Sequence, residues 1–399
     1  MTETPTYPQI KLLPKASPQR VRFGFPWVFA NELVMDRRTR KIPAGEIVQL
    51  NDNSGAPLAL CAFNPESKIA GRVLSLDCDT PIDQAWMNAR IARAAAHRER
   101  LYDDPYYRLA HAEADGLPGV IIDRFGDVFA VQPNAAWADA RMPMITEALT
   151  GVLSAKAVVK NASGRARKLE GLDEETLVVQ GALDAPVPVR MNGATYMADV
   201  LGGQKTGLFF DQRDNQAFAA KLAKGGSVLD VFSHVGGFGL AALASGATSA
   251  LAVDGSRAAL DLAEQGAEKS GFADRFSIHE GDAFEAMAGL IGEGRKFDVV
   301  ICDPPAFAPA KPALEAGLRA YERVARLGAQ LVADGGYLVL CSCSHAAGLE
   351  AFRTASLRGI GKAGRTTQII HTGQAGADHP VHPHLAESAY LKSIFLRML

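Results

Sequence analysis

The sequence of 399 residues is poor in cysteine and contains no long apolar run. Its five cysteines are scattered, and neither a CxxC pair nor a His/Cys cluster at zinc spacing occurs, so a disulfide framework and a metal site are not expected. No stretch approaches the roughly 18–20 apolar residues that span a bilayer, and the first residues lack the apolar core of a signal peptide. These absences exclude a secreted mini-protein and a membrane protein, and they predict a cytoplasmic location.

A strong charge of one sign is also missing, because 42 Lys and Arg oppose 44 Asp and Glu, a formal net charge of −2. Such a balance is not typical of nucleic-acid-binding proteins, which are often strongly basic. The positive charge is nevertheless uneven: it gathers in residues 1–75, on a helix over Arg90–Arg100 and in the loop Lys160–Lys168. Local basic surfaces of this kind can still neutralise phosphates, with modest non-specific affinity.

Two N-terminal regions differ in their apolar pattern. Residues 1–80 show short alternating strands with Gly, Pro and Asn turns, which is typical of a small β-barrel. Residues 81–190 begin with an Ala-rich helix and continue with strands and a helix around 142–153, which predicts an α+β domain. On the Ala-rich helix, four arginines are expected on the exposed side: Arg90, Arg93, Arg98 and Arg100.

The remaining residues, 191–399, alternate continuous apolar strands with helices predicted over 238–245, 256–270 and 314–332. Continuous apolar strands between helices are what a parallel sheet buried on both faces requires. The region is therefore predicted to be a doubly wound, Rossmann-like α/β domain. In such sheets, ligands bind beyond the carboxyl ends of the strands.

The first apolar strand, SVLDVF, is followed by a glycine-rich loop. Taken alone, the glycines fit the relaxed dinucleotide pattern GxGxx(G/A), which would indicate a nicotinamide enzyme. Two features favour another cofactor: the loop is long for a pyrophosphate turn, and the carboxylate inside the strand suits an ammonium group. S-adenosylmethionine carries such an ammonium. Cofactor contacts are therefore predicted for Asp230, Phe232, Ser233, Gly236 and Gly237.

Three further acidic residues follow the next strands. Asp254 ends SALAVD, where a carboxylate accepts both ribose hydroxyls in NAD and S-adenosylmethionine sites alike. Asp282 can accept from the adenine amino group while it caps the following helix. Asp303 begins DPPAF, in which two prolines stiffen the loop and hold the carboxylate toward a substrate. A (D/N)PP(F/Y)-type motif indicates methyl transfer to a base, so Asp303 is predicted to contact the cofactor and to polarise that base.

The fifth strand, GYLVLCSCSH, carries the candidate nucleophile Cys343. Methylation at C5 of cytosine needs a thiolate that adds to C6, and a cysteine just past a strand end suits that role. Cys341 lies inside the apolar run, and Cys302 is expected to face the packed helices because it precedes Asp303 by one residue. His345 could lower the pKa of the thiol, carry a proton or simply belong to the loop.

The motifs together resemble a known family, the bacterial 23S rRNA (cytosine-5) methyltransferases with an N-terminal PUA domain, a middle domain and a class I methyltransferase domain. The resemblance covers nearly the full length. It rests on these segments: Phe25–Phe29, Phe63–Pro65 with Arg72, Ala114–Gly119, Ile122–Asp127, Gln204–Asn215, Asp378–Pro380 and Tyr390–Lys392. It implies that Lys205 and Arg213, from the segment expected to close over the cofactor, also bind it.

The sequence departs from that family in places. The loop usually reads close to FSYTGGF, whereas His234 and Val235 stand here in place of two hydroxyl residues, and Ala306 follows the prolines where Lys or Arg is common. Proteins of the same architecture that methylate N7 of guanine need no covalent cysteine, so that reaction stays open as an alternative. So do a non-catalytic RNA-binding assembly factor and, more distantly, the nicotinamide enzyme. The implied partner is 23S rRNA or a large-subunit precursor, and a homodimer is possible.

Overall fold

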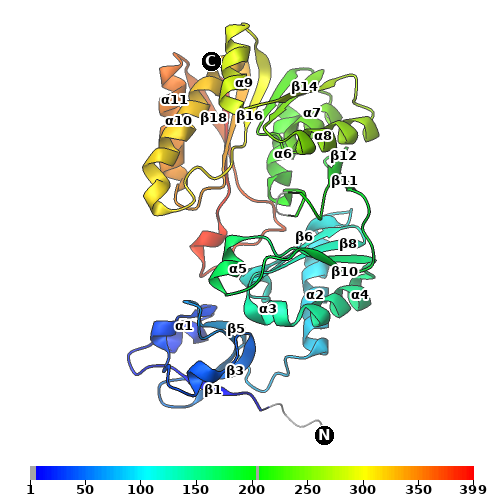
Figure 1. Ribbon diagram of the computed structural model, residues 1–399. Helices are drawn as coiled ribbons and strands as arrows, with labels where there is room; N and C mark the ends of the chain where they lie inside the picture. Colours follow the sequence, from blue (N-terminus) through cyan, green and yellow to red (C-terminus); the bar gives the residue numbers. More distant parts are fainter. Residues whose placement is uncertain (1–5, 204–205) are drawn as a thin grey trace. The chain divides into compact units, whose positions relative to one another are not determined.

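The computed structural model describes residues 6–203 and 206–399, and the chain forms two compact units (Figure 1). Unit 1 comprises Met1–Ala185, Val200–Thr206 and Asp378–Ser388, and unit 2 comprises Pro186–Asp199, Gly207–Ala377 and Ala389–Leu399. Two short stretches of the C-terminal half thus belong to unit 1. Within the described ranges, no helix has the length and apolar character needed to cross a membrane.

The first sheet of unit 1 has five short strands in the order β1-β3-β4-β5-β2. The turn between β3 and β4 is closed by Asp52, whose Oδ1 accepts hydrogen bonds from the N–H groups of Ser54 and Ala56. Gly55 in this turn has a φ of 99°, a conformation that glycine adopts without strain. The elements are α1 (Gln19–Arg22), β1 (Gln9–Lys11), β2 (Trp27–Val28), β3 (Glu46–Asn51), β4 (Pro57–Phe63) and β5 (Gly71–Ser75).

The second sheet of unit 1 also has five strands, in the order β10-β9-β8-β7-β6. Its helices α2 and α4 pack together in a core with Trp86, Ile91, Ile145 and Leu149. The predicted helix around 142–153 is present as α4. The elements are α2 (Gln84–Arg98), α3 (Ala136–Ala140), α4 (Met142–Leu153), α5 (Arg165–Leu169), β6 (Tyr106–His111), β7 (Val120–Phe125), β8 (Val128–Pro133), β9 (Ala157–Lys160) and β10 (Leu177–Gln180).

The expected exposure of the four arginines is wrong at two of them. Arg90 is half-buried and donates to the carbonyl of Leu74 at 3.2 Å, and the other is the last residue of α2. Arg98 is fully buried, and its guanidinium bonds both oxygens of the Asp115 carboxylate at 2.5 and 2.8 Å. It also donates to the backbone oxygen of Asp378 at 2.8 Å. A buried guanidinium persists only when it is paired in this way. Arg93 and Arg100 are exposed as predicted.

The loop Lys160–Lys168 is likewise less available to phosphates than its composition indicates. Arg167 is fully buried and donates to Asp139 Oδ1 at 2.8 Å and to Asp173 Oδ1 at 3.2 Å. Lys160 pairs with the same Asp139 carboxylate at 2.8 Å. Two of the cations counted toward a basic surface therefore neutralise acids inside unit 1.

Several segments that carry the family resemblance converge on one ion-pair cluster in unit 1. Arg72 pairs with Glu113 at 2.9 Å and with Glu170 at 3.2 Å. Trp27 donates its indole N–H to Glu113 at 2.7 Å, and Asn64 donates its amide to Glu170 Oε2 at 3.0 Å. Trp27 and Arg72 lie in strands of the first sheet, whereas Glu113 follows β6 and Glu170 follows α5. The cluster therefore joins the first sheet to segments beside the second.

Unit 2 contains a seven-stranded sheet in the order β15-β14-β13-β16-β17-β19-β18, in which β19 alone runs antiparallel to both of its neighbours. The first five strands of that order are parallel. They are β13 (Ser227–Val231), β14 (Ser249–Asp254), β15 (Phe276–Glu280), β16 (Phe297–Cys302) and β17 (Val332–Ser342), and β18 (Thr367–Gly373) and β19 (Lys392–Met398) complete the sheet. The hairpin β11 (Val187–Met191) and β12 (Ala194–Ala198) belongs to the same unit.

Helices cover both faces of this sheet, as the continuous apolar strands predict. One face packs Val231, Val300 and Leu338 against α9, α10 and α11, and the other packs Val228, Ile301 and Phe395 against α6 and α7. The helices are α6 (Arg213–Leu222), α7 (Gly237–Ala244), α8 (Arg257–Lys269), α9 (Ala283–Gly292), α10 (Leu314–Leu331) and α11 (Leu349–Lys362). The doubly wound α/β fold is confirmed.

Candidate active site

The carboxyl ends of the five parallel strands meet at one edge of the sheet in unit 2, and the predicted site residues follow those ends. The strand order reverses between β13 and β16, because β14 and β16 lie on opposite sides of β13. The loops after these two strands therefore flank the position where doubly wound sheets bind ligands. The first residue of antiparallel β19, Lys392, reaches the same edge beside the end of β17.

The loop after β13 is held in an unusual backbone conformation. Phe232 and His234 have φ values of 65° and 49°, in a region that side chains other than glycine rarely adopt. The N–H groups of Phe232 and Ser233 donate to the carbonyl of Val253 at 2.9 and 3.0 Å, which ties the loop to β14. Gly237 begins α7, where an added Cβ would lie 2.6 Å from the Gln216 amide nitrogen. The loop conformation is thus imposed by its neighbours, as is common at ligand sites.

Asp230 lies in β13 and is fully buried. Its Oδ2 accepts from the N–H of Gly239 at 2.8 Å, whereas its Oδ1 has no hydrogen-bond partner among the described residues. Burial raises the pKa of Asp230 to about 7, although the N–H groups of Gly239 and Phe238 oppose that rise. A buried carboxylate oxygen without a partner is costly, and it is satisfied if a ligand supplies a donor.

The carboxylates of Asp254 and Asp282 organise the neighbouring loops. Asp254 accepts from the N–H of His234 at 2.8 Å through Oδ2 and from the N–H of Ser256 at 2.9 Å through Oδ1. Asp282 caps α9, because its Oδ1 accepts from the N–H groups of Phe284 and Glu285. The predicted cap at Asp282 is therefore present, and both carboxylates keep lone pairs for other donors.

A buried network of hydroxyls joins the DPPAF loop to the end of β17. Ser344 Oγ accepts from the N–H of Ala308 at 2.9 Å and lies 2.7 Å from the hydroxyl of Tyr321 in α10. Ser342 Oγ donates to that same Tyr321 hydroxyl at 2.8 Å. Ser342 and Ser344 are fully buried on either side of Cys343. The network therefore fixes the backbone that carries Cys343 relative to the loop that begins with Asp303.

Replacing Ser344 with Ala is expected to lower the free energy of unfolding by about 1–3 kcal/mol, because the buried N–H of Ala308 would lose its partner. Urea unfolding measures this. Ser356→Ala is the matched control, because the hydroxyl of this buried serine only donates to the Phe352 carbonyl within α11. Its removal leaves no buried group unpaired, so a loss as large as that of Ser344→Ala would contradict the expectation.

The three cysteines of unit 2 have different surroundings. Cys302 and Cys341 are buried in the cores on opposite faces of the sheet, and burial raises the pKa of both thiols. Cys343 follows the end of β17 and is partly exposed. Of these three, Cys343 therefore has the surroundings that a reactive thiol needs.

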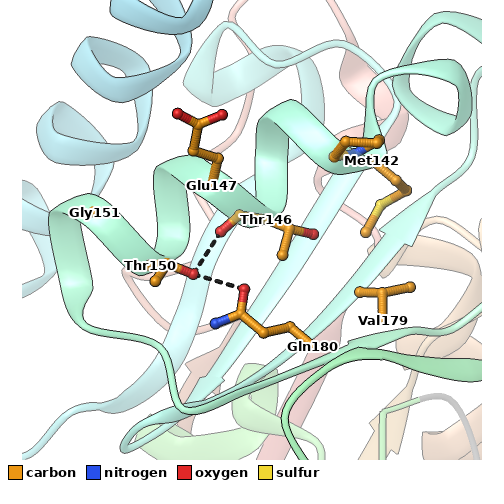
Figure 2. A pocket seen from close by; sticks show the side chains of 8 residues that line it. Met142, Thr146, Glu147, Thr150, Gly151, Val179 and Gln180 are labelled. Atoms are coloured by element: carbon orange, nitrogen blue, oxygen red, sulfur yellow. Dashed lines mark hydrogen bonds between the residues drawn. The ribbon is translucent and has the colours of Figure 1, made fainter.

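A hollow of about 610 Å³ lies in unit 1, between α4 and β10 (Figure 2). Its lining has one ionisable side chain, Glu147, and Thr150 there bonds Gln180 at 2.8 Å. None of the predicted site residues lines it. The described part of the chain also contains no group of three or more His, Cys, Asp or Glu side chains arranged to hold a metal ion.

Comparison with known proteins agrees with this geometry. A family model described as an S-adenosylmethionine-dependent methyltransferase matches residues 179–397, more than half of the chain, and a PUA-like domain model matches residues 10–76. The chain belongs to the S-adenosylmethionine-dependent methyltransferase family. The predicted fold class, enzyme class and cofactor are thereby confirmed.

Similar proteins span nearly the full length of this methyltransferase. A protein of Aliivibrio fischeri (strain MJ11) named ribosomal RNA large subunit methyltransferase I is 36% identical over 393 residues, which are 97% of this chain and 98% of the relative. One of the same name from Vibrio vulnificus (strain CMCP6) is 36% identical over 381 residues, 94% of this chain and 95% of the relative. The matching PUA-like domain confirms the resemblance inferred for the N-terminal region.

Two solved structures share the fold of this methyltransferase. A candidate SAM-dependent methyltransferase from Streptococcus mutans has a TM-score of 0.79 at 18% identity, and covers 98% of this chain and 100% of its own. A methyltransferase structure titled SMU.776, complexed with SAH, has a TM-score of 0.80 with the same identity and coverage. At this identity the likeness concerns the fold.

The residues present in the methyltransferase fit S-adenosylmethionine. Asp230 Oδ1 and Ser233 Oγ are buried polar atoms without partners among the described residues, and both lie at the strand edge beside the strained loop. An acceptor such as Asp230 Oδ1 matches an ammonium group. Arg213 is buried at the start of α6 with its guanidinium 5.7 Å from the Phe210 ring. Lys205 lies outside the described residues.

Some residues at this edge of the methyltransferase were not singled out from the sequence. The hydroxyl of Tyr390 donates to Asp211 Oδ2 at 2.5 Å, and its ring lies 5.6 Å from that of His345. Tyr321 and Gln216 reach the site from the middle of helices, where spacing alone carries no signal. A sequence signal existed only for Tyr390 and for Lys392 at the start of β19, since both belong to a segment of the family resemblance.

Proposed function

We propose that this methyltransferase forms 5-methylcytosine in the 23S rRNA of the large ribosomal subunit, with Cys343 as covalent nucleophile. The names of relatives that are 36% identical over nearly the whole chain support an rRNA substrate. The observation that carries the C5 chemistry is the position of Cys343, a partly exposed thiol just past β17 at the edge where Asp254 and Asp303 also lie. A methylation of guanine N7 has no use for such a thiol.

In this reaction Cys343 performs the step that activates the base. Its thiolate adds to C6 of cytosine, so that an S–C6 bond forms and the electrons of the C5–C6 double bond move toward the ring nitrogen N3. C5 thereby becomes nucleophilic. S-adenosylmethionine, when bound, would supply the methyl group as an electrophile on its sulfonium. The bond from C5 to the methyl carbon would form as the sulfur–methyl bond breaks, and the sulfur would keep that electron pair as a neutral thioether. A general base then removes the C5 proton, the double bond re-forms and the S–C6 bond breaks, which returns the thiolate.

Asp303 has the second role in the proposed chemistry. Its carboxylate begins the DPPAF loop, and its N–H donates to the carbonyl of Val231 at 3.2 Å, which ties the loop to the end of β13. A carboxylate there can accept from the exocyclic amine of cytosine or act at N3. The contact with the amine orients the base, and a proton that the Asp303 carboxyl group donates to N3 draws charge away from C5–C6 while the thiolate adds. The hydroxyl network of Tyr321 supports a constant spacing between Asp303 and Cys343.

We assign the cofactor contacts as follows. Asp230 Oδ1 accepts from the ammonium of S-adenosylmethionine, Asp254 from the ribose hydroxyls and Asp282 from the adenine amino group. The loop residues Phe232, Ser233, Gly236 and Gly237 line the same site. Arg213 and Lys205 complete the proposed set on the strength of the family resemblance.

In this function, residues 1–80 and 81–190 contact the RNA, and residues 191–399 carry out catalysis. An exposed group of cations around one turn of the first region supports this: Arg37, Arg38, Arg40 and Lys41. Such a group binds the phosphates of the RNA without distinguishing its bases. We also place the reaction in the cytoplasm, and light scattering of the purified protein tests whether it is a homodimer.

Methylation of purified 23S rRNA with isotope-labelled S-adenosylmethionine tests the proposed function. Mass spectrometry of the digested nucleosides is expected to show label in 5-methylcytidine. Label in 7-methylguanosine would contradict the C5 assignment, and no incorporation into either naked rRNA or large-subunit precursors would contradict an rRNA substrate. A reaction with no RNA measures the background.

A further inference from the structure

Lys392 lies beside the peptide that carries Cys343, although 49 positions separate them in the sequence. It is the first residue of β19 and pairs with Ser342, the last residue of β17, in antiparallel register. From there its Nζ donates to the carbonyl oxygen of Ser344 at 2.7 Å. The backbone of Lys392 is thus joined to the residue before Cys343, and its ammonium to the residue after it.

The side chain of Lys392 is half-buried, which is unusual for a lysine. Within the described part of the chain, its ammonium has no carboxylate within ion-pair distance, and its recorded acceptor is a neutral carbonyl. Burial lowers the pKa of Lys392, whereas a negative charge on Cys343 raises it. Because such coupling is reciprocal, the ammonium must favour the thiolate of Cys343 by the same free energy.

We propose that Lys392 is a positioning residue that fixes the loop around Cys343 and stabilises the Cys343 side chain as a thiolate. The thiol proton passes to water, the ammonium keeps its own proton, and the two opposite charges form a pair beside the base. The inference deepens the proposed function, on which the catalytic use of that thiolate rests. It makes Cys343 reactive near neutral pH, where a free thiol is mostly protonated.

The other titratable groups around Cys343 do not supply this charge. Tyr321 from α10 is a neutral phenol, since burial raises its pKa and both Ser342 and Ser344 engage its hydroxyl. Asp303, from the loop after β16, is an acid and opposes a thiolate. His345 lies in the same loop as Cys343, next to the ring of Tyr390. Of these groups, Lys392 is the one that carries a positive charge over the whole neutral range.

The pH dependence of alkylation tests the inference without relying on turnover. Full-length protein is treated with iodoacetamide at a series of pH values, and mass spectrometry measures the rate at Cys343. In the unchanged protein, the midpoint is expected below the ordinary thiol value of about 8.5. In Lys392→Met it should rise by about one pH unit, so that the rate near pH 7 falls about tenfold, and Lys392→Arg should restore most of the loss.

Cys78 serves as an internal reference in every sample, because it is partly exposed in unit 1, and burial and the charges of Asp77 and Asp79 raise its pKa. Its profile should not change in either variant. An unchanged Cys343 profile in Lys392→Met would overturn the inference. Should that variant not fold, a midpoint at or above about 8.5 in the unchanged protein would overturn it as well.

The two proposals can fail separately. If the midpoint of Cys343 moves as expected but RNA methylation persists in Cys343→Ala, the thiolate pair stands and its catalytic use is wrong. If methylation needs Cys343 but its alkylation profile does not depend on Lys392, the function stands and the role of Lys392 is wrong.

Discussion

Replacing Cys343 with Ala is expected to lower the rate of 5-methylcytidine formation by at least about 10³-fold, while S-adenosylmethionine binding remains unchanged. The thiolate addition is the step that makes C5 nucleophilic, and no other described side chain of this loop can form that bond. Cys341 is two residues away but lies inside β17, where Ser393 Oγ contacts its sulfur at 3.2 Å and burial raises its thiol pKa. It cannot replace Cys343 without unfolding the strand.

Rate measurements alone do not separate a nucleophile from a residue that shapes the site, so the adduct itself is the decisive measurement. RNA that carries 5-fluorocytidine has no proton at C5, and the S–C6 bond therefore persists after methyl transfer. A complex that survives denaturing electrophoresis is expected for the unchanged protein and not for Cys343→Ala.

Cys78→Ala is the matched control, because it removes the other partly exposed cysteine and leaves unit 2 intact. It should form the adduct at the normal rate. An adduct that persists in Cys343→Ala would assign the nucleophile elsewhere. Normal methylation in that variant, with no adduct for either protein, would instead favour a reaction such as guanine N7 methylation.

The local structure around these residues follows closely from the sequence. Helices α7, α8 and α10 begin and end within a residue of the expected ranges, because apolar periodicity and the turns at Gly236 and Ser256 mark them well. The alternation of side chains along a strand also predicted that Cys302, one residue before Asp303, faces the packed helices, and Cys302 does lie in the core with α9, α10 and α11.

Charge was the weaker guide, because a count of cations does not show which are paired. Asp115, which pairs with the buried Arg98, lies 17 residues away in sequence, and Asp139, which pairs with the buried Arg167, lies 28 residues away. Only the fold brings the members of these pairs together. The place of Lys392 beside Cys343 was not predicted either, because the register of Lys392 with Ser342 depends on an antiparallel strand that is distant in sequence.

The position of the stretch Asp378–Ser388 in unit 1 was also not predicted from the sequence. This stretch interrupts residues expected to form one catalytic region, yet it clusters with unit 1. The cause is a set of specific bonds, because Asp378 accepts from the backbone N–H of Arg108 at 2.9 Å and contacts Arg98 through its carbonyl. Composition carries no signal for such docking, since Asp378 and His379 are polar residues that are nevertheless buried.

Asp230→Asn is expected to remove a large pH dependence from the stability of the protein without its cofactor. A pKa raised from 3.8 to about 7 by burial corresponds to about 4 kcal/mol, at about 1.4 kcal/mol for each pH unit. The native state binds the extra proton between these two values. Stability contributed by this group is therefore greatest at low pH, falls as pH rises toward 7 and stays low above it. The amide of Asn can still accept from Gly239, so the loop contact survives.

Denaturant unfolding from about pH 5 to about pH 8 checks this. The quantity compared is the free energy of unfolding of the unchanged protein minus that of Asp230→Asn at each pH. The unchanged protein should lose about 3 kcal/mol relative to the variant over this range, and Asp261→Asn, at an exposed acid on α8, should behave like the unchanged protein. An identical pH profile for Asp230→Asn would contradict a raised pKa.

The same carboxylate should give S-adenosylmethionine binding the opposite pH dependence. Because an ammonium pairs with the ionised form, affinity is expected to rise up to about tenfold for each pH unit as pH approaches 7. In Asp230→Asn, affinity should be low and nearly flat from about pH 5 to about pH 7, which calorimetry measures. The cofactor would then stabilise the protein most near pH 7 and above, where the ionised Asp230 carboxylate alone destabilises it. This would explain why Oδ1 has no partner in the protein without cofactor: the ionised carboxylate is the binding site for a cation. Equal affinities and equal pH profiles for the two proteins would place the ammonium elsewhere and leave that buried charge without a function.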